Sequence, residues 1–119
     1  MGEVTAYLKT LEEPAHSTLE RLRQRTVALV PSAEEGTSYG MAALRYRGRP
    51  LISVVATKAG YSVFPFSSAV VAAVIADLPG FDSTKGGIRF TQQSLLPDSA
   101  FDALVTRRQS EIDAAAALP

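Results

Sequence analysis

The chain has 119 residues, the size of one ordinary domain and too few for two separate cores. Twelve Lys and Arg residues balance twelve Asp and Glu residues, so no overall charge attracts nucleic acid or a membrane surface. Cysteine is absent from the sequence, which excludes disulfides, zinc–thiolate sites and thiol nucleophiles. The first residues lack the apolar run of a secretory signal, and no apolar stretch approaches a bilayer span. We therefore expect a single soluble, cytoplasmic domain over residues 1–119.

Two helices are predicted at the start of the chain. Apolar residues recur at the helical spacing in Val4, Tyr7, Leu8 and Leu11. Pro14 is compatible with the first turn of a second helix, whose apolar stripe begins at Leu19 and which Pro31 ends.

The apolar period changes from helical to alternating after Gly36. A first strand places Leu44 and Tyr46 on one face and Arg45 and Arg47 on the other. Residues 51–57 and 61–64 are predicted to form the next two strands, with reversals at Gly48 and Gly60. These three strands form an antiparallel meander.

A helix, a strand and a final helix follow the meander. Ser67 or Ser68 caps the helix 69–78, which is apolar on nearly all sides and is expected to pack against the sheet through Val74. Residues 88–91 form a short strand, and a helix begins at Pro97 and Asp98, with a tail from Ala114 that frays. The predicted fold is α+β, a small antiparallel sheet with packed helices in the order α-α-β-β-β-α-β-α.

Alternate arginines near the first reversal suggest an anion-binding surface. Arg45, Arg47 and Arg49 would point the same way if the strand continued, although Gly48 is expected to break this alignment before Arg49. The alternative is a solvated strand face whose charges discourage aggregation.

A second polar segment combines hydroxyl groups, a cation and glycine amides. It consists of Ser83, Thr84, Lys85, Gly86 and Gly87, followed by Arg89. Such residues suit an anion-binding nest, although their order is not that of a P-loop. The structural alternative is a connecting loop whose glycines adopt positive φ.

Tyr39, Met41 and His16 each have a functional and a structural interpretation. Tyr39 could hold a ligand or lie in the core with a bonded hydroxyl, and Met41 could fill an irregular gap. His16 is the only histidine, and without other nitrogen or sulfur ligands nearby it is expected at the surface and not as a metal ligand or catalytic base.

Carboxylates are frequent in the first third of the chain and could bind a hard cation. The candidates are Glu12, Glu13, Glu20, Glu34 and Glu35. Solvated helix faces explain the same residues, because arginines are interleaved with them.

Several motifs in series resemble the bacterial YdhG-like family of domains of unknown function. They are Ser38-Tyr39-Gly40-Met41, Arg45-Tyr46-Arg47-Gly48-Arg49-Pro50-Leu51, Tyr61 to Ala69 and Ser83 to Phe90. The family usually has proline, glycine and proline where this chain has Ala42, Phe66 and Thr91, respectively. The resemblance implies a compact fold similar to frataxin, and some members are described as frataxin-like iron chaperones.

The sequence thus predicts a non-enzymatic binding domain for a small anionic ligand or an acidic protein segment. The candidate ligand-binding residues are Tyr39, Met41, Arg45, Ser83, Thr84, Lys85 and Arg89. A frataxin-like iron carrier is the first alternative, and an enzyme of unknown class is the second. No cofactor is predicted apart from iron under the first alternative, and the sequence gives no indication of oligomeric state.

Overall fold

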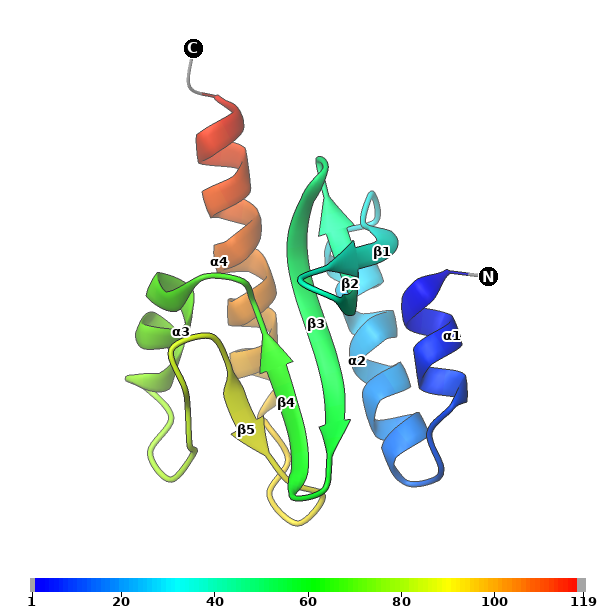
Figure 1. Cartoon of the computed structure of the whole chain (residues 1–119). Coiled ribbons are helices and arrows are strands. Elements are labelled where there is room, and N and C mark those ends of the chain that lie inside the picture. The colour runs from blue at the N-terminus through cyan, green and yellow to red at the C-terminus, as the bar shows by residue number, and fades with distance from the viewer. Residues whose placement is uncertain (1, 118–119) are drawn as a thin grey trace.

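Five consecutive strands form a single antiparallel sheet in the computed structural model, which describes residues 2–117 (Figure 1). The strands are β1 (Glu34–Ser38), β2 (Met41–Tyr46), β3 (Arg49–Thr57), β4 (Gly60–Phe64) and β5 (Ile88–Phe90). Their order across the sheet is β1-β2-β3-β4-β5, so every strand pairs with its neighbour in sequence. The predicted α+β class and antiparallel meander are confirmed.

Four helices complete the fold. They are α1 (Glu3–Lys9), α2 (Ala15–Leu29), α3 (Ser68–Ile75) and α4 (Asp98–Ala116). In Figure 1, α2 and α4 lie behind the sheet, α1 lies beside β1 and β2, and α3 lies beside α4. The hydroxyl of Tyr7 on α1 accepts a hydrogen bond of 2.9 Å from the amide of Ala56 on β3, which ties α1 to the sheet. None of the described helices is long and apolar enough to cross a membrane.

The sequence prediction missed β1. This strand carries Glu34, Glu35 and Gly36, residue types that are uncommon in strands, and it has no apolar alternation to reveal it. Its conformation depends on contacts from elsewhere in the chain: it pairs with β2, and Glu35 accepts hydrogen bonds from the amide and hydroxyl of Thr5 on α1 at 2.6 and 2.7 Å. Tertiary contacts thus outweigh local propensity here.

The two faces of the sheet differ in composition. Val54, Val63 and Ile88 lie opposite one another on adjacent strands and are buried under the helices. The alternate positions face the other way and include Val55 and Phe64, both half-buried, and the exposed Arg89. No described helix crosses this second face, which is turned toward the viewer in Figure 1.

Two details of the helix predictions need correction. Val74 is buried as predicted, but α3 packs mainly on α4 and not on the sheet. The buried residues of α3 are Val70, Val71 and Val74, which form one apolar face that a neighbouring helix can cover. Ala114 to Ala116 belong to α4, so the predicted fraying is wrong for these residues. Residues 118–119 lie outside the described part.

Candidate functional site

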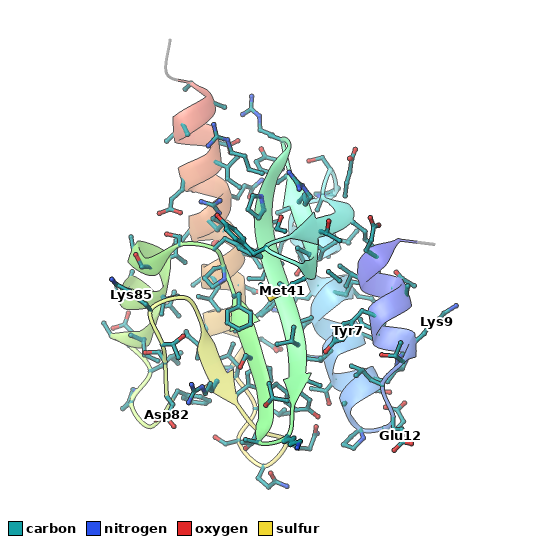
Figure 2. All side chains as sticks on the ribbon, viewed as in Figure 1. Tyr7, Lys9, Glu12, Met41, Asp82 and Lys85 are labelled. Atoms are coloured by element: carbon teal, nitrogen blue, oxygen red, sulfur yellow. The ribbon has the colours of Figure 1, made fainter. Side chains whose placement is uncertain are left out.

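A groove with a volume of about 350 Å³ lies on the open face of the sheet, where β4 ends. Its walls come from the β1–β2 turn, the segment that joins β4 to α3, and the loop before β5. The lining residues are Tyr39, Met41, Phe64, Phe66, Ser67, Ser68, Lys85 and Gly86. The structure therefore brings together Tyr39, Met41 and Lys85 from the predicted set. Figure 2 shows Met41 over the sheet and Lys85 on the loop next to α3.

Two aromatic rings lie side by side along this groove. The ring centroids of Tyr39 and Phe66 are 5.8 Å apart, and the ring planes differ by 18°, an offset-stacked arrangement. Tyr39 is 85% exposed, which excludes the interpretation of this residue as a core tyrosine. Its ring is therefore held in solvent by the turn that carries it and by its stacking on Phe66.

Both of these aromatic residues have a left-handed backbone. Tyr39 has a φ of +52° and Phe66 a φ of +57°, a region that residues with a Cβ rarely adopt. Tyr39 and Gly40 form a two-residue turn with positive φ at both positions, for which asparagine followed by glycine is the preferred sequence. The backbone thus accepts strain at both positions that carry a ring.

A tight turn sets the position of Lys85. The amide of Thr84 donates to the carbonyl of Gly87 at 2.9 Å, and the amide of Gly87 donates to the Thr84 hydroxyl at 3.2 Å. Gly87 lies directly against β4, since a Cβ at this position would be 2.6 Å from the Phe64 ring. Glycine is therefore required at position 87 by close packing, while Lys85 and Gly86 occupy the exposed tip of the turn.

This turn does not have the geometry of the predicted nest. The amides of Thr84 and Gly87 are already used within the turn, and neither Gly86 nor Gly87 has the positive φ expected of them. Ser83 pairs with Ile88 as an isolated bridge, which explains its position without a ligand. Ser83 and Thr84 are thus placed beside the groove but are absent from its lining.

Arg89 lines a different pocket, at the opposite end of β4. This pocket has a volume of about 250 Å³ and is lined in part by Thr57, Gly60, Phe81 and Asp82. Because Arg89 and Lys85 border separate hollows, the structure does not join them into one predicted site.

The three arginines of the β2–β3 hairpin also do not form a fork. A bulge between Leu44 and Arg45 interrupts the alternation of β2. Arg45 donates to the carbonyls of Thr37, at 2.9 Å, and Gly48. Its guanidinium is thereby held along the hairpin and is absent from the groove lining.

Arg47 and Arg49 also lie apart from Arg45. Arg47 has a φ of +53° in the turn after β2 and forms an ion pair of 2.9 Å with Asp113 on α4, so the expected common face is wrong. Arg49 begins β3 and is exposed.

The predicted acidic metal ligands are distributed over the segment between α1 and α2, helix α2 and strand β1. No group of three or more His, Cys, Asp or Glu side chains suited to a metal ion occurs among residues 2–117. Glu13 accepts hydrogen bonds from the Ser17 hydroxyl and amide, which lower its pKa. Glu20 is paired with Arg23 at 2.7 Å, and the hydrogen bond from Arg23 lowers the pKa of Glu20. Glu34 and Glu35 lie on β1, while Glu12 lies in the segment between α1 and α2 (Figure 2).

His16 lies in the first turn of α2. Its Nδ1 is 2.7 Å from the carbonyl oxygen of Leu8, so this nitrogen donates its proton to the backbone of α1. Neither Ser38 nor Ser83 is among its hydrogen-bond partners in the described part of the chain. The arrangement supports the structural interpretation of His16.

Phe64 and Phe66 were not identified as site residues from the sequence. The sequence predicts Phe64 only as the last residue of a strand. Phe66 follows a proline, and its residue type does not indicate a positive φ. One signal was available: Phe66 occupies the position where the YdhG-like family usually has glycine, the residue that a left-handed backbone favours.

The fold is similar to that of a solved protein, although the sequence matches no protein-family model and no curated protein. The solved structure is YdhG from Bacillus subtilis, a protein of the DUF1801 family, with a TM-score of 0.82 and 16% sequence identity. The match covers 93% of this chain and 91% of that chain. The chain therefore has the α+β fold of a DUF1801 family protein.

Proposed function

We propose that this protein is a non-enzymatic domain that binds a small organic anion in the groove between Tyr39, Phe64 and Lys85. The observation that carries the proposal is that one cation, Lys85, lies at a groove whose other lining residues are mainly apolar. Lys85 is exposed at the groove, and it forms no ion pair with any of the described residues. An anion with an apolar body complements both parts of this lining.

The groove favours a small molecule over an acidic protein segment. Its volume of about 350 Å³ lies at the lower end of the range typical of small-molecule pockets. An acidic peptide would need further cations along its path, and Arg45, Arg47 and Arg89 lie outside the groove lining. A single exposed Lys85 matches one carboxylate better than several.

The hydroxyl of Ser67 has partners of its own. It accepts from the amide of Val70 at 3.2 Å as the N-cap of α3 and donates to Glu111 at 2.8 Å. The predicted capping role of Ser67 is thereby confirmed, and both hydrogen bonds of this hydroxyl are made within the fold. These bonds support binding over nucleophilic catalysis at the groove.

The iron-carrier alternative stays a hypothesis that rests on the family resemblance. Of the candidate carboxylates, Glu13, Glu20 and Glu35 already accept hydrogen bonds from other residues. The candidates are also spread over separate parts of the chain. Anaerobic calorimetry with ferrous iron tests this alternative: binding that disappears when Glu12, Glu13 and Glu20 are replaced by alanine would favour it over the organic anion.

The anion proposal is tested by calorimetric titration with a panel of small carboxylates and their uncharged amides. We expect one or more carboxylates to bind more tightly than the matching amide, and Lys85→Ala to weaken binding roughly two- to fivefold, as for an exposed charge pair. Lys9→Ala is the matched control, because Lys9 is an exposed lysine on α1, remote from the groove (Figure 2).

Three results would contradict the proposal. They are the absence of binding by every carboxylate, equal affinities for the carboxylates and their amides, and an equal loss of affinity in Lys85→Ala and Lys9→Ala. Binding of a Glu-rich hexapeptide in place of the small carboxylates would identify an acidic segment as the ligand instead.

A further inference from the structure

The walls of the groove point to the class of organic anion that it binds. We infer that the ligand is an aromatic carboxylic acid, whose flat ring stacks on the Tyr39–Phe66 pair while its carboxylate lies near Lys85. This inference rests on the proposed function, and it adds a requirement for a planar ring that anion binding alone does not impose.

The first support is the chemistry of the apolar lining. Of the side chains in the groove, Tyr39, Phe64 and Phe66 are aromatic and Met41 carries a polarisable thioether. Aromatic rings gain from offset stacking beyond the area they bury, and a thioether contacts a ring favourably at its edge. A saturated chain of the same size makes neither contact.

The second support is the arrangement of the stacked pair. The planes of Tyr39 and Phe66 differ by only 18°, so the two rings already form a short stack. Because Tyr39 is 85% exposed and borders the groove, the stack has room for a third flat ring. Both rings line the groove from left-handed backbone positions, and neither belongs to the buried core.

The third support is the position of the backbone turn that carries Lys85. The turn from Thr84 to Gly87 is closed by two hydrogen bonds, and Gly87 packs on the ring of Phe64. The backbone that carries Lys85 is therefore held against one of the aromatic residues of the groove. A carboxylate attached to a ring can meet Lys85 while the ring lies on the aromatic wall, since both belong to the lining of the same groove.

The inference is tested with two pairs of carboxylates that share charge and carbon number but differ in planarity. The pairs are benzoate with cyclohexanecarboxylate, and 2-naphthoate with decahydro-2-naphthoate. Calorimetry on the wild-type protein should show the aromatic member of each pair binding about fivefold to tenfold more tightly. Phe66→Leu, which keeps an apolar side chain without a ring, should reduce this ratio to below about twofold.

Phe81→Leu serves as the matched control, since Phe81 lies in the other pocket and is also partly buried. It should leave the ratio unchanged. Equal affinity for aromatic and saturated acids would overturn the inference while leaving the proposed function intact. A ratio that survives in Phe66→Leu would also overturn it, as would the absence of binding by all four acids. The proposed function itself is contradicted only when no carboxylate of the wider panel binds.

Discussion

Phe66 occupies a backbone position that glycine would occupy at lower cost. A φ of +57° costs a residue with a Cβ roughly 1 kcal/mol, which is similar to the gain expected from stacking on Tyr39. We therefore expect Phe66→Gly to change the free energy of unfolding by less than about 1 kcal/mol, because relief of backbone strain offsets the lost stacking. Urea denaturation measures this difference.

Phe64→Ala is the comparison for this prediction. Phe64 is also half-buried, but its own φ is not positive and its ring lies against Gly87. Its replacement should cost about 2 kcal/mol or more, since a packed ring is lost without any relief of strain. If the two variants proved equally destabilised, the Phe66 ring would be a folding contact, and its link to the groove would lose support.

At the level of single residues, the sequence indicated part of the groove. Tyr39, Met41 and Lys85 were identifiable because their residue types stand out in polar, turn-like segments. Arg45 and Thr84 were misjudged because their side chains bond to nearby backbone atoms, which depends on the register of β1 and β2 and on the closed turn at Gly87. Such local bonds compete with ligand binding and leave no pattern in residue types.

Among the contacts between elements, the one between the Lys85 turn and β4 is sensitive to substitution. A Cβ at Gly87 would lie 2.7 Å from the carbonyl oxygen of Val63, whereas a Cβ at Gly86 would meet no atom within 4 Å. We expect Gly87→Ala to lower the free energy of unfolding by about 1 to 3 kcal/mol through overpacking. Gly86→Ala should have little effect, and thermal or urea denaturation of both variants checks the difference. Equal stabilities would show that the turn can move away from β4.

The prediction of whole elements succeeded where the apolar pattern was strong. Helices α2 and α4 have apolar residues at helical spacing, and strands β3 and β4 are short segments rich in apolar and β-branched residues. The sequence missed β1 because an edge strand held by pairing and by Thr5 needs no apolar face. The partner of α3 was misjudged because a helix that is apolar on most sides does not specify which neighbour it packs against.

At the scale of the whole molecule, a contact between the β2–β3 hairpin and α4 connects the sheet to the last helix. Asp113 accepts hydrogen bonds from the Tyr46 hydroxyl at 2.7 Å and from Arg47 at 2.9 Å. These bonds lower the pKa of Asp113 below its ordinary value of 3.8. A carboxylate with a lowered pKa in the folded state stabilises the fold above its ordinary pKa, and this contribution is lost as the pH falls through the folded-state pKa.

Asp113→Asn should therefore be less stable than the wild-type protein at pH 7, and the difference should diminish as the pH falls below about 3.8. Urea midpoints measured from pH 7 to pH 2 test this dependence. Asp77→Asn is the control, because Asp77 is exposed and makes no ion pair within residues 2–117. A difference between Asp113→Asn and the wild-type protein that stayed constant with pH would show that the charge of Asp113 contributes nothing.

The two outer strands of the sheet affect how copies of the molecule meet in solution. An exposed strand edge offers unpaired amides and carbonyls to a strand from another chain, which is a common route to aggregation. Here β1 presents the exposed carboxylate of Glu34 and is flanked by α1, while β5 has only three residues. Charge on one edge and short length on the other disfavour edge-to-edge association. The open face of the sheet can thus remain accessible to a ligand without inviting the growth of an intermolecular sheet.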